Sequence, residues 1–360
     1  MPTIVIAAGG TAGHVVPALA VADALRAQGA QVEFIGGERA EAELVPAAGY
    51  PLHRLRVEGI DRSNPLRAAR ALLRAARATG RARRLLRKIG ADAVLGGGGY
   101  VAGPVGLAAR TLRLPLVLTE ADSHLGVSNR LLAPFAARVC LAFPIEGRTG
   151  AKWLVTGRPV PRGTEEGDRE AARARLGVPA DGECLLVFGG SLGARRLNEA
   201  AVEAFGATAP CSVVHAAGRR DYDDLRARLA ELGSPAHYRL FPYIEPFADA
   251  LAASDLAAAR AGGSVFELAA AGLPSILVPY PHATGDHQDA NARFMEQAGA
   301  AVVIPDSELD GPRLAREVGG LLAAPQRMAE MANAARAVAR PDAAERVAQE
   351  LLAVVANDGH

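Results

Sequence analysis

The sequence contains few cysteines, few aromatic residues and almost no net charge. Its three cysteines, Cys140, Cys184 and Cys211, lie far apart and form no Cys-x-x-Cys pair. We therefore predict neither a disulfide framework nor a zinc site, and we expect a reducing compartment. Aromatic residues make up 4% of the chain, and 40 Lys and Arg stand against 39 Asp and Glu. Such a chain offers neither stacking surfaces for bases nor an overall basic field, so we expect no nucleic-acid partner.

Long hydrophobic runs are also absent. The longest uncharged stretch, residues 93–109, contains four consecutive glycines and Pro104. In lipid such a segment would leave backbone polar groups without partners, so we predict no membrane-spanning helix. The N-terminus has no basic segment and runs directly into Gly9 and Gly10, which indicates a first strand rather than a signal peptide.

The remaining composition is that of a globular protein with more than one domain. Half of the residues are hydrophobic and 22% are charged, and 360 residues are enough for two domains. Short β-branched runs ending in glycine alternate with Ala- and Leu-rich stretches, a pattern typical of parallel strands joined by helices. The pattern begins twice, at residues 3–8 and again at 184–188. The sequence therefore predicts an α/β protein with two similar halves.

Proline and glycine mark the expected boundaries. Residues 155–163 are rich in both and favour a linker over a helix or strand. We predict an N-terminal domain over 1–157 and a C-terminal domain over 158–340. Pro341 interrupts the preceding helix, and a capping-box pattern follows it. We therefore expect 341–360 to form a helix that packs back on the N-terminal domain.

Each half places a glycine turn, at residues 9–13 and 189–193, between its first strand and helix. Free backbone N–H groups at the positive end of a helix favour a phosphorylated ligand, although such glycines can also serve a tight turn alone. Neither loop contains Gly-Lys-Ser/Thr, so neither is a P-loop. Residues 97–102 fit the relaxed dinucleotide pattern G-x-G-x-x-A, with Glu120 about twenty residues later. A nicotinamide or flavin enzyme is therefore an open alternative.

Four ordered motifs resemble those of the MurG family of bacterial glycosyltransferases, family 28. They are Gly9-Gly-Thr-Ala-Gly-His-Val-Val-Pro17, Gly98-Gly-Tyr-Val-Ala-Gly-Pro104, Gly189-Gly-Ser-Leu-Gly-Ala194 and Glu267-Leu-Ala-Ala-Ala-Gly-Leu-Pro274. The resemblance runs from about residue 4 to residue 350. It implies a GT-B fold, in which two Rossmann-like domains turn their parallel sheets toward a central cleft. The acceptor would bind the N-terminal domain, and the nucleotide sugar mostly the C-terminal one.

The resemblance also implies an activity. Members of this family are inverting transferases that move N-acetylglucosamine from UDP-GlcNAc to the C4 hydroxyl of undecaprenyl-pyrophosphoryl-MurNAc-pentapeptide. This step converts lipid I to lipid II in peptidoglycan synthesis, and it implies neither a cofactor nor a metal. The alternatives are a GT-B glycosyltransferase with another lipid or small-molecule acceptor, a UDP-GlcNAc 2-epimerase, and a non-catalytic nucleotide-sugar-binding module.

Donor-binding residues follow from the same resemblance. Ser191 and the amides of residues 261–264 would hold the diphosphate, Glu267 would bind the ribose hydroxyls, and the backbone of Ile244 would contact the uracil edge. The implied donor-binding set is Thr11, Ala12, Gly13, Ser191, Ile244, Gly262, Gly263, Ser264, Glu267, His287 and Gln288.

Inverting transfer needs a base for the acceptor hydroxyl and stabilisation of the departing diphosphate. The resemblance implies His14 and Glu120 as catalytic residues. An imidazole titrates near neutral pH, whereas Glu120 would need burial to become a comparable base, and the sequence leaves this choice open. Thr119 and Ala121 stand where the family has a histidine and a polar residue. The implied acceptor-side residues are Tyr100, Asp122 and Asn129.

Residues 62–88 contain ten basic residues and no acidic one. Arginines at 67, 70, 74, 77, 81 and 84 are spaced by three and four, which places them on one helical face, and leucines supply apolar surface elsewhere. Such a segment suits the inner leaflet of an anionic membrane, the alternative being a solvated helix face. Given the implied lipid-linked acceptor, we predict a peripheral enzyme on the cytoplasmic face of the cell membrane.

Overall fold

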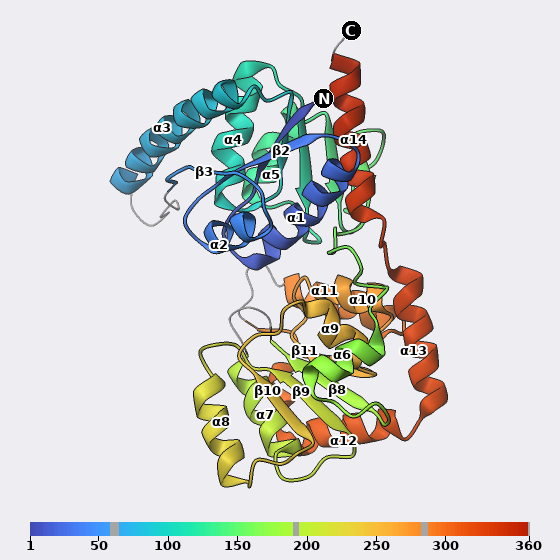
Figure 1. The fold of residues 1–360 in the computed structure, drawn as a ribbon. Coiled ribbons are helices and arrows are strands. Elements are labelled where there is room, and N and C mark those ends of the chain that lie inside the picture. The colour runs from blue at the N-terminus through green and yellow to red at the C-terminus, as the bar shows by residue number, and fades with distance from the viewer. Residues whose placement is uncertain (58–64, 190–193, 282–286, 359–360) are drawn as a thin grey trace. The chain divides into compact units, whose positions relative to one another are not determined.

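The computed structural model describes residues 1–57, 65–189, 194–281 and 287–358, with the backbone alone at 65–75, 287 and 358. The chain divides into two compact units (Figure 1). Unit 1 comprises Met1–Pro161 and Arg340–His360, and unit 2 comprises Arg162–Ala339. Unit 1 thus extends a few residues past position 157 and takes in the C-terminal segment.

Unit 1 contains a sheet of seven strands within the described residues, in the order β3-β2-β1-β4-β5-β6-β7, and all neighbours pair in parallel. Its strands are β1 (Thr3–Ala7), β2 (Gln31–Gly36), β3 (Leu52–Arg54), β4 (Ala93–Gly96), β5 (Leu116–Glu120), β6 (Arg138–Leu141) and β7 (Trp153–Val155). Its helices are α1 (Ala12–Ala27), α2 (Ala40–Ala47), α3 (Pro65–Ile89), α4 (Gly99–Leu112), α5 (Val127–Leu132) and α14 (Ala343–Asp358). Because the strands are parallel, their carboxyl ends all lie at one edge of the sheet.

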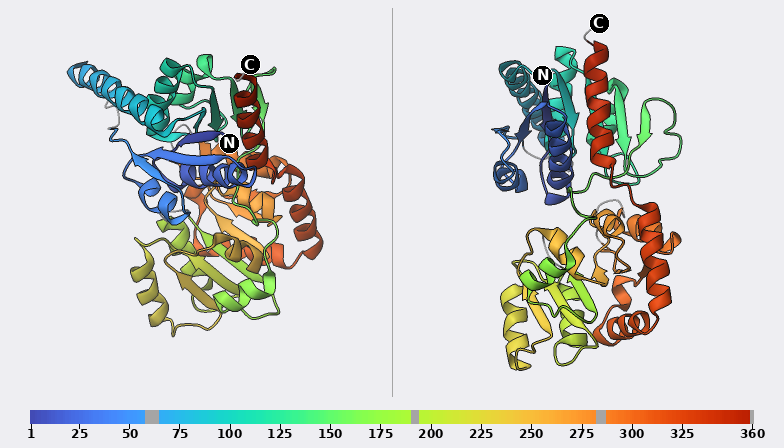
Figure 2. Two further views of the ribbon diagram at one scale, coloured as in Figure 1. Left: turned by 45° about the horizontal axis from the view of Figure 1, so that its top comes forward. Right: turned by 45° about the vertical axis from the view of Figure 1, so that its right-hand side comes forward.

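Side-chain alternation along β1 separates the two halves of the core of unit 1. Ile4 and Ile6 face α1 and α14, whereas Val5 and Ala7 face the side covered by α3, α4 and α5 (Figures 1 and 2). Since both faces of the sheet are buried, β1 reads as a nearly continuous apolar run, which is typical of a central parallel strand.

Helix α14 completes the core of unit 1 from the far end of the chain. Val347 and Leu351 are fully buried in the same apolar cluster as Val21 and Leu25 of α1. The two helices pack against each other, as the right-hand view in Figure 2 shows. The hydrophobic stripe of α14 is therefore part of the folded interior.

Unit 2 contains a second parallel sheet, with six described strands in the order β10-β9-β8-β11-β12-β13. The strands are β8 (Cys184–Phe188), β9 (Ser212–Ala216), β10 (Tyr238–Phe241), β11 (Leu256–Ala259), β12 (Ser275–Leu277) and β13 (Ala301–Val303). The helices are α6 (Arg169–Leu176), α7 (Arg195–Phe205), α8 (Tyr222–Glu231), α9 (Phe247–Ala253), α10 (Val265–Ala271), α11 (His287–Gln297), α12 (Gly311–Leu322) and α13 (Pro325–Val338). One face of the sheet packs on residues of α7, α8 and α12.

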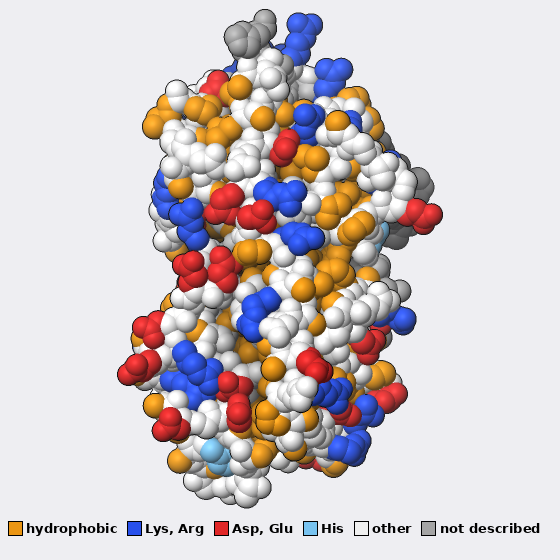
Figure 3. Space-filling view, turned by 90° about the vertical axis from the view of Figure 1, so that its right-hand side faces the viewer, with side chains coloured by type: hydrophobic (Ala, Val, Ile, Leu, Met, Phe, Trp, Pro, Cys, Tyr) orange, Lys and Arg blue, Asp and Glu red, His pale blue; other side chains and the backbone are white. Residues whose placement is uncertain are grey.

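The surface carries charges of both signs. On the face seen in Figure 3, acidic and basic side chains are interspersed rather than gathered by sign. The described part of α3 differs, because it turns Ala78, Ala82 and Leu86 inward and leaves its arginines exposed. In the part of the chain that the structure describes, no helix combines the length and the hydropathy needed to cross a membrane.

Candidate active site

A cavity of about 280 Å³ opens at the carboxyl ends of β1, β4 and β5 in unit 1. This edge is where open α/β sheets bind their ligands. The fold brings five separate segments of the chain to the cavity, around residues 13–17, 97–100, 119–129, 140 and 157–159. The predicted site residues that line it are Gly13, His14, Tyr100, Glu120, Asp122 and Asn129.

Glu120 is the last residue of β5, and its side chain is buried. One carboxylate oxygen accepts the N–H of Asp122 at 3.2 Å, and the other accepts the N–H of Gly126 at 2.8 Å and the Asn129 amide at 2.9 Å. Burial raises the pKa of Glu120, and these three hydrogen bonds oppose the rise. Glu120 therefore organises the loop that follows its own strand.

Asn129 is a second buried polar residue on the cavity wall. Its amide nitrogen donates to Glu120 and to the carbonyl oxygen of Thr119, both at 2.9 Å. Its oxygen Oδ1 is buried and has no hydrogen-bond partner among the described residues. A buried amide oxygen normally finds a donor, so this atom is well placed to accept a hydroxyl of a bound molecule.

His14 lies in the first turn of α1, which begins with Thr11 as N-cap and continues through Ala12 and Gly13. The Thr11 carbonyl accepts the backbone N–H of His14 at 3.0 Å, and the imidazole Nδ1 lies 3.5 Å from the Thr11 hydroxyl. Gly98 has φ +93°, and a Cβ at that position would lie 2.7 Å from Cδ2 of the ring. Glycine at this position therefore lets the start of α4 pack directly on the imidazole.

Tyr100 lines the cavity, but its hydroxyl donates to Glu41 at 2.8 Å. Burial, together with this carboxylate, raises the pKa of the Tyr100 hydroxyl to about 12. Glu41 belongs to α2, is fully buried and was not among the predicted site residues. Glu41 lies four residues before Val45, a spacing that places both side chains on the buried face of α2. This spacing is the sequence feature that could have predicted a buried Glu41.

Arg158 is another cavity residue that the sequence pattern did not reveal. It comes from the Gly- and Pro-rich linker, is 9% exposed and donates from Nη2 to the carbonyl oxygen of Gly13. A guanidinium carries a permanent charge and several donors in one plane, a geometry that suits phosphate oxygens. Linker composition alone gives no sign that one of its side chains faces a cavity.

In unit 2 the predicted donor loop lies between β11 and α10. It contains Gly262 and Gly263, and Ser264 is the N-cap of α10. Asn291 of α11 is hydrogen-bonded to this loop, because its amide nitrogen donates to the carbonyl oxygen of Ala261 at 2.9 Å. The side chain of Asn291 is buried, so the loop is anchored to the interior of the unit.

The other predicted donor residues lie in different parts of unit 2. Glu267 is in the first turn of α10, and Ile244 is buried in the loop between β10 and α9. The side-chain oxygen of Gln288 in α11 accepts the backbone N–H of Tyr280 at 2.9 Å. Ser191 lies outside the described residues, and so does the side chain of His287.

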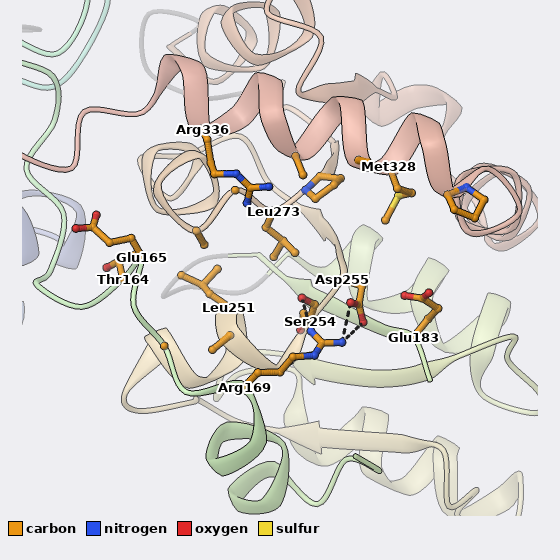
Figure 4. Close-up of a pocket in the computed structure, with 18 of the residues that line it drawn as sticks. Thr164, Glu165, Arg169, Glu183, Leu251, Ser254, Asp255, Leu273, Met328 and Arg336 are labelled. Carbon is orange, nitrogen blue, oxygen red and sulfur yellow. Dashed lines mark hydrogen bonds and ion pairs between the residues drawn. The ribbon is translucent and has the colours of Figure 1, made fainter. Parts of the chain in front are cut away.

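A larger cavity of about 440 Å³ lies at the amino ends of β8 and β11, the opposite edge of the second sheet (Figure 4). Asp255 is the charged centre of its wall and pairs with Arg169 at 2.7 Å and Arg173 at 3.0 Å. Burial, and then the nearby Asp255, raise the pKa of Glu183. Arginines thus neutralise Asp255, and none of the predicted site residues lines the cavity.

Comparison with known families identifies both halves of the chain. Residues 4–141 match the glycosyltransferase family 28 N-terminal domain, and residues 184–347 match the glycosyltransferase family 28 C-terminal domain. The chain belongs to glycosyltransferase family 28. The predicted family is therefore confirmed. Membership of this family argues against the alternative of a nicotinamide or flavin enzyme.

Relatives match this family 28 chain over almost its whole length. A UDP-N-acetylglucosamine--N-acetylmuramyl-(pentapeptide) pyrophosphoryl-undecaprenol N-acetylglucosamine transferase of Stutzerimonas stutzeri is 42% identical, with 98% of each chain covered. The protein of the same description from Methylococcus capsulatus is 44% identical, with 97% of this chain and 98% of the relative covered.

Solved structures confirm the GT-B fold of this family 28 chain. Acinetobacter baumannii MurG superposes with a TM-score of 0.76 at 33% identity, covering 98% of this chain and all of the other. The calicheamicin glycosyltransferase CalG4 and a putative UDP-N-acetylglucosamine 2-epimerase from Listeria monocytogenes give TM-scores of 0.71 and 0.70 at 19% and 17% identity. At such low identity these two show a shared fold only.

Proposed function

We propose that this chain transfers N-acetylglucosamine from UDP-GlcNAc to the C4 hydroxyl of undecaprenyl-pyrophosphoryl-MurNAc-pentapeptide. The observation that carries the proposal is an identity of 42–44% over nearly the full length to transferases described by this reaction. The cavity at the carboxyl edge of the first sheet supports it, because acid–base and cationic groups meet there.

His14 is the base in this proposal. Its imidazole lines the cavity and would take the proton of the acceptor C4 hydroxyl as the hydroxyl oxygen attacks C1 of the donor sugar. The bond from C1 to the phosphate oxygen breaks, and the electron pair leaves with UDP. The oxygens of Glu120 are occupied by three donors of the following loop, so we assign Glu120 to holding that loop.

The acceptor has two groups that the cavity residues suit. The unpartnered Oδ1 of Asn129 would accept a hydroxyl of the muramyl sugar. Arg158 and the first-turn amides of α1 would bind the pyrophosphate, since both offer donors to an anion. Asp122 and Tyr100 complete the wall on the acceptor side.

The donor is assigned to unit 2. The loop amides at Gly262, Gly263 and Ser264 would hold the diphosphate at the N-terminus of α10, and Glu267 in the same first turn would bind the ribose. Ile244 is assigned to the uracil edge. Ser191, His287 and Gln288, with Thr11, Ala12 and Gly13 of unit 1, complete the proposed donor set.

A membrane surface is the proposed working location. The α3 helix exposes arginines along its described part, and α4 and α5, which contact each other, expose Leu107, Val127 and Leu131. Basic and apolar side chains together favour binding to anionic lipid. This arrangement suits an acceptor whose undecaprenyl chain stays in the bilayer.

Release of UDP from UDP-GlcNAc, measured with and without a lipid I analogue, tests the proposed function. We expect release only with the analogue, and a disaccharide product that carries the new linkage. Release with an unrelated acceptor alone, or formation of UDP-N-acetylmannosamine without any acceptor, would instead select a different transferase or the epimerase. Since the loop amides at the N-terminus of α10 hold the leaving diphosphate in this proposal, activity should survive EDTA.

A further inference from the structure

Glu41 is a fully buried carboxylate to which neither the family motifs nor the proposed chemistry gives a role. Its Oε2 accepts the N–H of Gly10 at 2.9 Å. Its Oε1 accepts the N–H of Gly37 at 2.9 Å and the hydroxyl of Tyr100 at 2.8 Å. Three donors therefore converge on one side chain.

These donors lie in the segments that follow three neighbouring strands. Gly10 follows β1, Gly37 follows β2, and Tyr100 is in the first turn of α4 after β4. The sheet order places β2, β1 and β4 side by side. Glu41 thus joins the carboxyl ends of three adjacent strands, at the edge where the cavity opens.

The Glu41 carboxylate can accept hydrogen bonds from all three donors because it is charged. Burial acts to raise its pKa, but the hydrogen bonds from Gly10, Tyr100 and Gly37 together hold the pKa below its ordinary value. A buried ion persists only where such donors compensate for lost water. An amide of the same shape would turn an N–H₂ group toward the N–H of Gly10 or Gly37, so it could not accept from all three.

The backbone around Glu41 is packed as closely as glycine permits. A Cβ at Gly37 would overlap the Tyr100 hydroxyl, and one at Gly99 would overlap the carbonyl oxygen of Gly9. A Cβ at Gly9 would itself lie 2.9 Å from the Glu41 carboxylate. A shift of the carboxylate therefore moves the loop that it holds.

That loop leads directly to the proposed base. Gly10 has φ +116° and precedes Thr11, the N-cap of α1. A Cβ at Gly10 would lie 3.9 Å from Nδ1 of His14. The imidazole therefore lies beside the Gly10 turn.

We propose that Glu41 is a positioning residue, whose carboxylate fixes the turn at Gly9 and Gly10 and thereby the imidazole of His14 against the acceptor cavity. The inference rests on the proposed function, in which His14 acts on the acceptor hydroxyl. Displacements of about 1 Å in a catalytic group can lower rates by about 100-fold. Loss of the Glu41 carboxylate should therefore lower kcat measurably, although Glu41 does not touch the substrate.

The first test compares Glu41→Gln with Glu43→Gln, a matched change on the exposed side of α2. We expect Glu41→Gln to lower kcat about tenfold or more per folded molecule, with KM for UDP-GlcNAc unchanged within about twofold. Glu43→Gln should match the parent. Equal kcat in the parent and in Glu41→Gln, once each is corrected for the folded fraction, would overturn the proposal and leave Glu41 a purely structural residue.

The second test needs no activity, so it separates this inference from the proposed function. In ¹⁵N-labelled protein, the imidazole signals of His14, assigned with His14→Gln, should move in Glu41→Gln and stay in place in Glu43→Gln. If Glu41→Gln does not fold, Glu41→Asp, which keeps the charge but withdraws the carboxylate by one methylene, should move the same signals. Unmoved His14 signals in a folded variant overturn the positioning role, whereas a parent without acceptor-dependent UDP release overturns only the proposed function.

Discussion

Single buried polar residues decide the chemistry that unit 1 can offer. Glu120, Asn129 and Glu41 are all nearly or fully buried, and each holds backbone or side-chain groups at the edge of one cavity. A carboxylate in this situation is sensitive to protonation, because its acceptor capacity falls when it binds a proton. The pH dependence of the enzyme therefore reports on Glu120 and Glu41.

Glu120→Gln tests the role of the loop after β5. The amide nitrogen of glutamine would face one of three donors, and we expect kcat to fall about 10- to 100-fold through loss of a charge-assisted hydrogen bond. Burial raises the pKa of Glu120, so parental activity should decline with falling pH at values above 4.5. Protonation of the proposed base His14 also lowers activity at acidic pH, so the variant should keep that limb and lose only the contribution of Glu120. An acidic limb of unchanged shape in the variant would mean that Glu120 does not contribute to it.

His215 gives a prediction about stability rather than activity. Burial lowers its pKa from 6.5 to about 3, so the unfolded chain binds a proton between these values and the native state does not. Unfolding free energy should therefore rise with pH across this window, by up to about 1.4 kcal/mol per pH unit from this residue.

Urea denaturation at pH 5, 6 and 7 measures that slope. His215→Gln should reduce it, whereas His124→Gln, a change at an exposed histidine, should leave it as in the parent. Equal slopes for His215→Gln and the parent would mean that the buried imidazole accepts a proton in the native state.

At the scale of elements, α3 combines a buried and an exposed face over its described part. Small and aliphatic residues pack inward, and Arg77, Arg81 and Arg84 remain in solvent. The spacing of three and four residues in the sequence predicted this separation of faces. Whether the exposed charges meet lipid is a question that vesicle binding answers.

Changing Arg77, Arg81 and Arg84 to Gln should weaken binding to anionic vesicles by one to two orders of magnitude. Each basic residue contributes about 1 kcal/mol at such a surface, and helix propensity is almost unchanged. Vesicle sedimentation at two salt concentrations measures the effect. Removing three exposed arginines from unit 2, at positions 226, 228 and 327, is the control of equal charge. Equal binding by both triple variants would leave α3 a solvated helix.

At the scale of the whole molecule, the chain leaves unit 1 after Pro161 and returns to it at Arg340. The return segment is needed because α14 covers apolar side chains of α1 and of the first sheet. Unit 1 therefore depends on residues that are far from it in the sequence.

Leu351→Ala should destabilise unit 1 by about 2–5 kcal/mol, the usual range for a fully buried leucine, and leave unit 2 unaffected. Hydrogen exchange, followed by mass spectrometry, reads the two units separately. Gln349→Ala, on the exposed side of the same helix, should change neither. Equal loss of protection in both units would show that they unfold as one.

The sequence by itself determined the α/β class, the glycine loop after β1, the basic stripe and the family, because local periodicity and short ordered motifs carry this information. The tertiary structure decided which side chains share the cavity. Glu41 meets Gly10 and Tyr100 across 31 and 59 residues, and Arg158 reaches Gly13 across 145. Burial and hydrogen bonding between such distant residues arise only when the parallel strands bring their carboxyl ends together, so no local pattern in the chain encodes them.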